Sequence, residues 1–291
     1  MIKYLLKAMR PHQWSKNLVV FAGLIFAREF TDIDLILKSI LVFGVFCLVS
    51  SAVYLINDVI DYEKDRNHPK KRNRPIAADK LPRSTATVWA VILMATALAG
   101  AYFMLNIQFT TAVLAYLLLI IFYSTVLKQV VIIDVMTIAA GFVLRAVGGA
   151  LALPVEISAW LVVCTTLLAL FIGFGKRRHE IMLLEANASG HRKILAKYSI
   201  PLLEQLISIV TAATIVAYAF YTLSPDVKQK LGVDHLELTI PFVIYGIFRY
   251  LYLIHKHDRG GSPARVLFTD PPILICVLLW IISVMLLMYL S

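Results

Sequence analysis

Charge is scarce in this chain. Only 16% of its 291 residues are Asp, Glu, Lys or Arg, whereas 60% are hydrophobic, and the mean hydropathy is +0.79. The apolar share of an ordinary soluble domain is nearer to ~45–50%. The scarcity of charge therefore excludes a soluble globular domain and predicts an integral membrane protein.

The motifs of several enzyme and binding classes are missing as well. There is no Gly-rich phosphate loop and no Ser-His-Asp constellation, and the one H-E pair, at His179, lacks the second His of a zinc protease. The cysteines Cys47, Cys164 and Cys276 fall in apolar segments at wide separations, which predicts neither a disulfide framework nor a thiolate metal site. No soluble module carries the positive charge, so we expect no nucleic-acid partner.

The apolar residues gather into nine segments. We therefore expect an all-α fold, namely a single polytopic membrane domain over residues 1–291, built as a bundle of nine transmembrane helices. The expected spans are 17–27, 35–59, 85–105, 110–127, 134–152, 157–175, 202–223, 238–255 and 271–290. The first is short for a ~30 Å hydrocarbon core, so the amphipathic residues 1–14 are expected to lie in the membrane interface. No small-residue cleavage site follows them, which predicts that they are not a cleaved signal.

The cations are distributed unevenly over the two sides of this bundle. Of the 28 Lys and Arg residues, 22 fall at the N-terminus or in the loops on its side, and 4 fall in the opposite loops. The positive-inside rule then predicts a multi-pass protein of the cell membrane with a cytoplasmic N-terminus and cytoplasmic active-site loops. Much of the net charge of +10 would lie on that face, where it favours anionic lipids and phosphorylated substrates.

Acidic residues follow the second apolar segment in a regular pattern. Asn57, Asp61 and Asp65 recur at intervals of four, so on a helix they share one face, with Asp58 on a neighbouring row. An all-oxygen set without Cys or paired His favours Mg²⁺ over zinc. We predict that Asn57, Asp58, Asp61 and Asp65 hold Mg²⁺ together with substrate phosphates, and that the three aspartates are catalytic.

Basic residues are the candidates for binding phosphate. They are Arg66, Lys71, Arg72 and Arg74 directly after the acids, and Lys128, Arg145, Lys176 and Arg177 further on. A basic loop is also a topogenic signal, and cations at a helix C-terminus also complement its dipole. Arg145 is different because a guanidinium inside a transmembrane helix needs a partner, for which a carboxylate or a substrate phosphate are the alternatives. Tyr123 is either a ligand contact or an interface aromatic.

Several of these patterns resemble a known family. The N-D-x-x-D-x-x-x-D of residues 57–65 resembles the first aspartate motif of the UbiA superfamily of membrane prenyltransferases. Four further motifs resemble its decaprenyl-phosphate phosphoribosyltransferase branch: R-P-x-Q-W-x-K-N at 10–17, which contains Lys16, D-R-x-H-P-x-K-R-x-R-P-I-A at 65–77, Y-S-x-x-L-K at 123–128 and G-K-R at 175–177. The resemblance covers nearly the whole chain.

The resemblance implies a reaction and its substrates. The expected donor is 5-phosphoribosyl diphosphate, the acceptor is a polyprenyl phosphate lipid, the metal is Mg²⁺, and the pathway is cell wall biosynthesis. Lys16, Asn57, Tyr123 and the basic residues above would bind the substrates. The second aspartate motif of other superfamily members is replaced here by the basic run from Lys176, which suits a phosphate-bearing acceptor.

Two other functions remain open at this stage. A UbiA-type prenyltransferase would move a polyprenyl group from its diphosphate to an aromatic or quinone-precursor acceptor. A transporter or lipid scaffold would use the acids to bind a coupling cation, and its acids should then lie near the bilayer midplane at broken helices.

Overall fold

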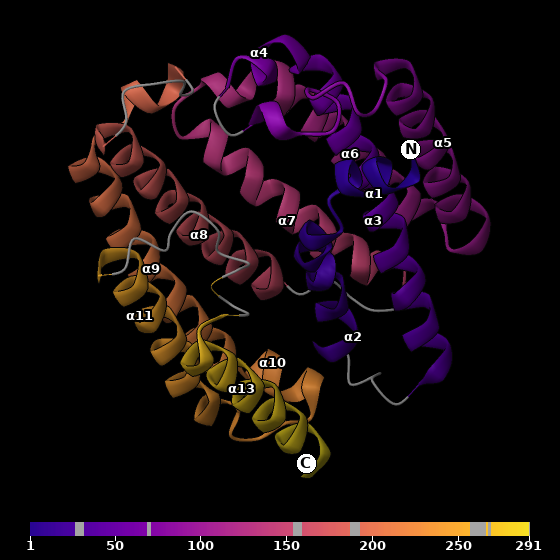
Figure 1. Cartoon of the computed structure of the whole chain (residues 1–291). Helices are drawn as coiled ribbons and strands as arrows, with labels where there is room; N and C mark the ends of the chain where they lie inside the picture. Colours follow the sequence, from indigo (N-terminus) through magenta and orange to yellow (C-terminus); the bar gives the residue numbers. More distant parts are fainter. Residues whose placement is uncertain are drawn as a thin grey trace. The chain divides into compact units, whose positions relative to one another are not determined.

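All the regular secondary structure in the described part of the chain is helical (Figure 1). This computed structural model describes residues 1–26, 32–68, 71–153, 159–186, 193–256, 266 and 269–290. The chain divides into two compact units, one of residues 1–25, 29–128 and 141–157 and the other of residues 26–28, 129–140 and 158–291.

The first unit is built around one long helix, α3. Its elements in order are α1 (Ile2–Met9), the 3₁₀ helix η1 (Pro11–Phe21), α2 (Ala22–Phe26), α3 (Ile33–Ile60), α4 (Tyr62–Arg66), η2 (Lys71–Asn73), α5 (Arg83–Met104), α6 (Ile107–Thr125) and η3 (Leu127–Gln129). Helix α3 packs against α5, η1, α1 and α6. Phe46 of α3 is fully buried and meets the rings of Phe109 and Tyr116 of α6 edge to face.

The second unit packs its helices in pairs. Its elements are α8 (Ala159–Ala186), η4 (Lys193–Lys197), α9 (Ile200–Leu223), α10 (Pro225–Leu231), η5 (Leu236–Thr239), α11 (Ile240–Lys256) and α13 (Pro271–Leu290). Helix α9 packs against α8 and α11, and α11 packs against α13. Helix α7 (Ile133–Leu151) begins in this unit and ends in the first.

The all-α membrane class predicted from the sequence is confirmed. Within the described residues, seven helices are long and apolar enough to cross a membrane: Ile33–Ile60, Arg83–Met104, Ile107–Thr125, Ile133–Leu151, Ile200–Leu223, Leu236–Lys256 and Pro271–Met288. They match seven of the predicted spans closely. The total of nine and the single domain stay predictions, and residues 27, 157 and 158 of two predicted spans lie outside the described residues.

Two predicted elements differ from the structure. The first span was expected to be a transmembrane helix, but residues 11–21 form a 3₁₀ helix, which continues into α2 for only five residues. The basic run from Lys176 was expected in a loop, but α8 continues through it to Ala186. Nothing between residues 176 and 186 is Gly or Pro, and Glu180 lies within ion-pair distance of both Lys176 and Arg177, so the helix has local reasons to continue.

Gly149 of α7 allows η1 to pack directly against this helix within the first unit. A Cβ atom built on Gly149 would lie 2.1 Å from the carbonyl oxygen of Val20 in η1. Its neighbour Gly148 faces the Phe46 ring at 3.1 Å in the same way. Because Gly149 has no side chain, η1 can pack this close to α7. This position of η1 places Asn17 in the buried site described below.

Replacing Gly149 with Ala should weaken this packing. The new methyl group must push η1 away from α7, and overpacking of this kind costs about 1–3 kcal/mol. The matched control is Gly44→Ala in α3, where a Cβ atom meets nothing within 4 Å and where the better helix propensity of Ala contributes up to about 1 kcal/mol. Thermal unfolding of the two purified variants in detergent measures the difference, and equal midpoints would contradict the close packing.

Candidate active site

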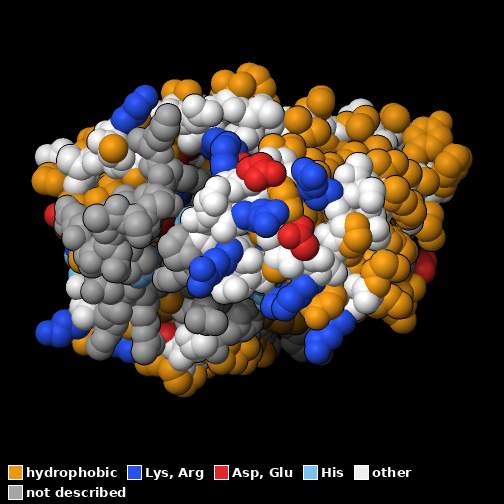
Figure 2. Space-filling model, turned by 45° about the horizontal axis from the view of Figure 1, so that its top comes forward, with side chains coloured by type: hydrophobic (Ala, Val, Ile, Leu, Met, Phe, Trp, Pro, Cys, Tyr) orange, Lys and Arg blue, Asp and Glu red, His pale blue; other side chains and the backbone are white. Residues whose placement is uncertain are grey.

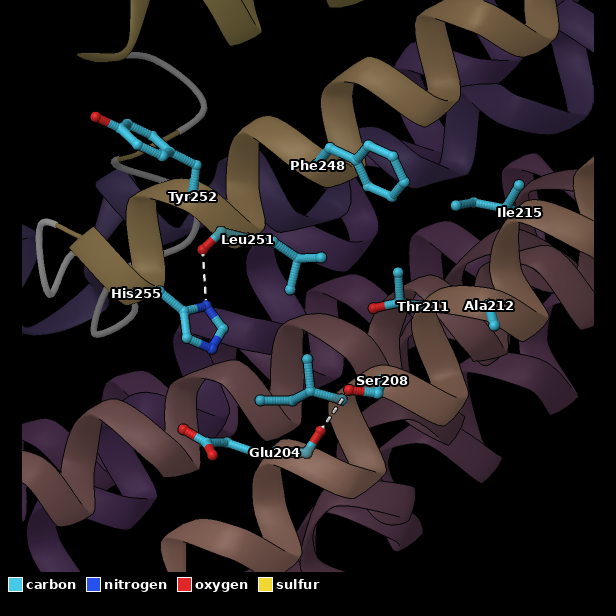
Figure 3. Close-up of a pocket in the computed structure, with 10 residues that line it drawn as sticks. Glu204, Ser208, Thr211, Ala212, Ile215, Phe248, Leu251, Tyr252 and His255 are labelled. Carbon is cyan, nitrogen blue, oxygen red and sulfur yellow. Dashed lines mark hydrogen bonds between the residues drawn. The ribbon is translucent and has the colours of Figure 1, made fainter.

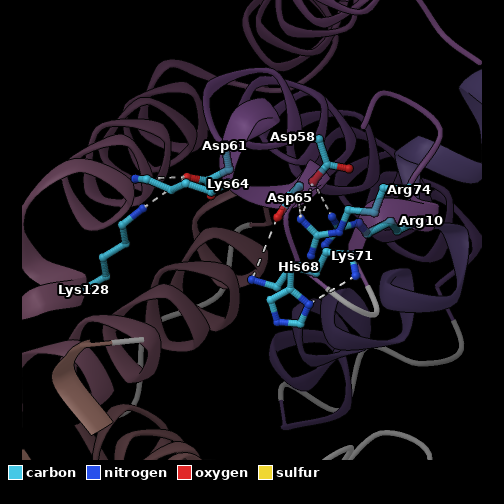
Figure 4. Close-up of polar contacts among 9 residues, drawn as sticks. All are labelled: Arg10, Asp58, Asp61, Lys64, Asp65, His68, Lys71, Arg74 and Lys128. Atoms are coloured by element: carbon cyan, nitrogen blue, oxygen red, sulfur yellow. Dashed lines mark hydrogen bonds and ion pairs between the residues drawn. The ribbon is translucent and has the colours of Figure 1, made fainter. Parts of the chain in front are cut away.

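The three aspartates do not lie on one straight helix, contrary to what their spacing predicted. Helix α3 ends at Ile60, and Asp61 forms its C-cap with φ −86° and ψ 10°, after which α4 begins. Asp58 and Asp65 are each only 2% exposed, and both accept a hydrogen bond from Nη1 of Arg74, at 3.0 and 2.5 Å (Figure 4). One guanidinium therefore bridges two buried carboxylates.

A second guanidinium holds Asp58 from the N-terminal side. Arg10 lies between α1 and η1 in the left-handed conformation, with φ 55°, and its Nη2 donates to Oδ1 of Asp58 at 2.5 Å. Its guanidinium also lies 4.8 Å above the ring centre of Tyr54. Sequence reasoning did not name Arg10 as a site residue. The signal was present, because Arg10 opens the first motif that carries the family resemblance.

Asp61 belongs to a different group of side chains. Its Oδ1 atom lies 3.8 Å from Nζ of Lys64 and 3.9 Å from Nζ of Lys128, and its side chain is 29% exposed. Figure 4 shows Lys128 reaching Asp61 from the side opposite to the bridged pair of Asp58 and Asp65. Asp61 and Lys128 are 67 positions apart in the sequence, and both were predicted to belong to the active site. The structure brings them together.

The loop after α4 supplies a further cation. Nζ of Lys71 lies 4.0 Å from Oδ1 of Asp65, and the backbone N–H of Lys71 donates to Nδ1 of His68 at 3.3 Å (Figure 4). Arg66 is engaged elsewhere, since its Nη1 donates to the hydroxyl of Tyr62 at 2.8 Å and lies 3.7 Å from Asp79. Lys71 and Arg74 thus contact the acids, whereas Arg66 contacts Tyr62 and Asp79, and substrate binding by Arg66 stays a prediction.

Four further predicted residues of this unit lie outside the contacts described above. Arg72 is exposed, and Asn57, Lys16 and Tyr123 are half-buried in α3, η1 and the last turn of α6. Their roles in substrate binding stay predictions.

The four predicted metal ligands do not form a ready-made cage. Within the described ranges, no three His, Cys, Asp or Glu side chains converge closely enough to hold a metal ion. The pair of Asp58 and Asp65 nevertheless fits Mg²⁺, because this ion commonly takes one or two carboxylates and completes its shell with water and substrate phosphates. Oδ2 of Asp58 is buried and has no hydrogen-bond partner within the described residues, as an atom kept for a cation would. The full ligand set stays a prediction.

Arg145 is buried in the first unit among neutral groups. Its side chain donates to Oδ1 of Asn17 at 2.8 Å, to the hydroxyl of Tyr116 at 2.5 Å and to the carbonyl of Gly141 at 3.0 Å, and the residue is 7% exposed. No carboxylate of the described chain lies within ion-pair distance of it. A carboxylate and a substrate phosphate were the two expected partners of Arg145. No carboxylate partner is present among the described residues, and the substrate phosphate stays a prediction.

In the second unit, Arg177 forms a buried ion-pair network. Its Nε donates to Oδ2 of Asp134 at 2.7 Å, its Nη1 donates to Glu180 at 2.5 Å, and Arg177 and Asp134 are 1% and 0% exposed. The hydroxyl of Tyr198 donates to the other oxygen of Asp134 at 2.7 Å. Burial, followed by this hydrogen bond, raises the pKa of Tyr198 above its ordinary value, so the hydroxyl remains a neutral donor.

The three cations of the run from Lys176 thus lie in three environments. The side chain of Lys176 is 42% exposed and lies 3.8 Å from Glu180. Arg178 is buried and donates from Nε and Nη2 to Oε1 of Glu204 of α9. These contacts favour a structural role for the two arginines, and substrate binding by Lys176 and Arg177 stays a prediction. Figure 2 shows Lys and Arg side chains gathered around acidic ones on the face that it displays.

Comparisons with known proteins agree with this fold and sequence pattern. A profile of the UbiA prenyltransferase family matches residues 17–269. The chain is 32% identical to the decaprenyl-phosphate phosphoribosyltransferase of Corynebacterium glutamicum, over 98% of this chain and 86% of that protein. It is 33% identical to the enzyme of the same name from Mycobacterium tuberculosis, over 96% and 92% of the two chains. The structure of a UbiA homologue from Archaeoglobus fulgidus bound to DMAPP and Mg²⁺ has a TM-score of 0.72 at 17% identity and covers 99% of both chains.

The class of the protein follows from these findings together. Its apolar helices and its relatives make it a multi-pass membrane transferase with an all-α fold. The chain belongs to the UbiA prenyltransferase family, because the family profile spans most of its length. The resemblance noted in the sequence motifs is thereby confirmed.

The structural role of Arg177 can be tested by comparing the stability of two neighbouring variants. Arg177→Ala leaves the buried carboxylate of Asp134 without its cation, and breaking a buried pair costs about 3–5 kcal/mol of unfolding free energy. The neighbouring variant Lys176→Ala removes an exposed cation and should change stability by less than about 1 kcal/mol. Thermal unfolding of both variants in detergent is the measurement, and equal stabilities would contradict the structural role of Arg177.

Proposed function

We propose that this protein transfers the 5-phosphoribosyl group from 5-phosphoribosyl diphosphate to a polyprenyl phosphate and releases diphosphate. The observation that carries the proposal is the likeness over nearly the full chain to decaprenyl-phosphate phosphoribosyltransferases of two genera. The motifs of the first unit support it, since a bridged pair of carboxylates lies among cations at the end of an apolar helix. Such a position suits a water-soluble polyphosphate donor.

The chemistry requires charge stabilisation more than proton transfer. The bond between ribose C1 and a diphosphate oxygen breaks with its electron pair going to diphosphate, and an oxygen of the lipid phosphate forms the new bond to C1. The lipid phosphate is already an anion, so no general base is needed to activate it. Cations placed around the leaving group and the incoming phosphate are what the reaction needs.

The described contacts suggest how the cations of the first unit divide this work. Lys71 and Arg74, which already contact Asp65, and the exposed Arg72 would bind the phosphates of the donor. Lys128 beside Asp61 and the buried Arg145 would bind the acceptor phosphate or the 5-phosphate of the donor. Arg10 would hold Asp58 in place through the contact that the two side chains make.

We further propose that the divalent metal of this enzyme is Mg²⁺, held by Asp58 and Asp65. UbiA homologue structures bound to Mg²⁺ and to Cd²⁺ support the use of a divalent ion in this family. When bound, the ion would supply Lewis-acid stabilisation of the diphosphate leaving group. Arg74 occupies the space between the two carboxylates here, so the site must release at least one of its two contacts when a metal enters.

Asp61→Asn tests the active site without removing a buried partner. Asp61 is partly exposed and its ion pairs are long, so the variant should fold normally, whereas loss of an active-site charge commonly lowers turnover by ~10²–10³. The control is Glu63→Gln on the exposed face of α4, which should keep its activity. The measurement is incorporation of radiolabelled 5-phosphoribosyl diphosphate into an organic-extractable lipid in the presence of polyprenyl phosphate.

Two results would count against these assignments. Near-normal incorporation by Asp61→Asn would remove this residue from the active site. A purified protein that ignores 5-phosphoribosyl diphosphate but prenylates an aromatic acid would overturn the proposed function and leave family membership intact.

We also propose that the N-terminus and the 63–83 loop are cytoplasmic, as the uneven distribution of Lys and Arg over the loops favours. Single cysteines at Asn73 and Lys228, introduced after replacement of Cys47, Cys164 and Cys276, should be labelled by an impermeant thiol reagent from opposite sides. We expect labelling at position 73 from the cytoplasm only and at position 228 from outside only. Labelling of both positions from one side would refute this topology.

A further inference from the structure

A groove between α9 and α11 lies entirely within the second unit. Its volume is about 760 Å³, and Figure 3 shows side chains of both helices lining it. The α9 wall carries Glu204, Ser208 and Thr211 with Ile207 among them, followed by Ala212 and Ile215. No residue of the predicted active site lines this groove.

Both walls of the groove change from polar to apolar in the same direction. Along α9 the lining passes from Glu204, near the N-terminus of the helix, to Ile215 two to three turns further on. Along α11 it passes from His255, in the last turn, back to Phe248. Glu204 and His255 lie at the same end of the groove in Figure 3. A groove with one polar end and one apolar end matches an amphiphile whose headgroup lies at the polar end.

The polar end presents hydrogen-bond acceptors. Oε1 of Glu204 accepts both hydrogen bonds from Arg178, and no hydrogen bond within the described part of the chain uses Oε2. Nδ1 of His255 lies 2.9 Å from the carbonyl oxygen of Leu251, which can only accept, so the proton of the neutral ring is on Nδ1. Nε2 of His255 is then a second acceptor at the same end.

The α9 wall contains a further polar atom, about two turns from Glu204. Thr211 is 7% exposed, and its hydroxyl is buried without a hydrogen-bond partner among the residues that the structure describes. Ser208 donates its hydroxyl proton to the carbonyl of Glu204 and keeps its lone pairs for accepting. An unpaired buried hydroxyl is unusual in a folded protein and indicates a partner supplied from outside the chain.

We propose that this groove binds one molecule of phosphatidylethanolamine. Its primary ammonium has three N–H donors, of which one can bind Oε2 of Glu204, the oxygen that Arg178 leaves open, and another Nε2 of His255. An acyl chain lies along the apolar part of the groove, between Ile215 and Phe248. The site is separate from the residues assigned to phosphoribosyl transfer and does not depend on that assignment.

The same chemistry disfavours other lipids. Phosphatidylcholine has the positive charge but no N–H donor, so it cannot make the two hydrogen bonds. Phosphatidylglycerol and polyprenyl phosphate bring a negative charge with no compensating ammonium to the carboxylate of Glu204. A charge-assisted hydrogen bond from an ammonium N–H is thus what the groove recognises.

Native mass spectrometry of the delipidated full-length protein in detergent tests the proposal. Phosphatidylethanolamine, phosphatidylcholine and phosphatidylglycerol, all with palmitoyl and oleoyl chains, are added separately and their apparent Kd values are compared. We expect phosphatidylethanolamine to bind about tenfold more tightly than phosphatidylcholine, as one additional charge-assisted hydrogen bond provides. Equal Kd values, or a preference for phosphatidylglycerol, would overturn the proposal.

Two variants locate the site and a third is the control. Ala212→Trp fills the groove from an exposed position of α9 and should abolish the preference, whereas Val216→Trp, at a 51% exposed position of the same helix, should leave it unchanged. Glu204→Gln keeps the shape and an acceptor for Arg178 but removes the charge, so it should lose most of the preference. An unchanged preference in either Ala212→Trp or Glu204→Gln would place the lipid elsewhere and refute the groove as its site.

Discussion

The shared hydrogen bonding of Arg74 with Asp58 and Asp65 is the interaction on which the site of the first unit depends. A buried carboxylate at the end of an apolar helix is costly unless a cation compensates it, and one guanidinium here serves two. The loop between α4 and α5 must return to the end of α3 for this contact to form. The position of the loop cations is therefore a consequence of the buried acids.

The same constraint is met differently by two of the buried arginines, Arg177 and Arg145. Arg177 is paired with Asp134 and Glu180, which neutralise it within the second unit. Among the described residues, the hydrogen-bond acceptors of Arg145 are neutral, Asn17 and Tyr116 among them, so dipoles solvate its charge without cancelling it. A cation preorganised in this way is suited to stabilise an anion, because its surroundings need not rearrange when the anion binds.

The break between α3 and α4 separates the acids into two groups with different surroundings. Asp58 and Asp65 are buried and bridged, whereas Asp61 is partly exposed and lies near Lys64 and Lys128. A single straight helix would have presented Asp61 and Asp65 in one row. The turn at Asp61 instead allows one short segment to hold a buried pair and a solvent-accessible acid.

The sequence by itself determined the membrane class, the family and seven spans, because hydropathy and short motifs are local properties of the chain. It also located the acids and most of the cations near them. Only the tertiary structure decided which of these residues meet. Arg10 reaches Asp58 across 48 positions, and Asp134 reaches Arg177 across 43. Such pairings depend on how helices pack and where Gly149 lets a backbone approach, and no local pattern encodes either.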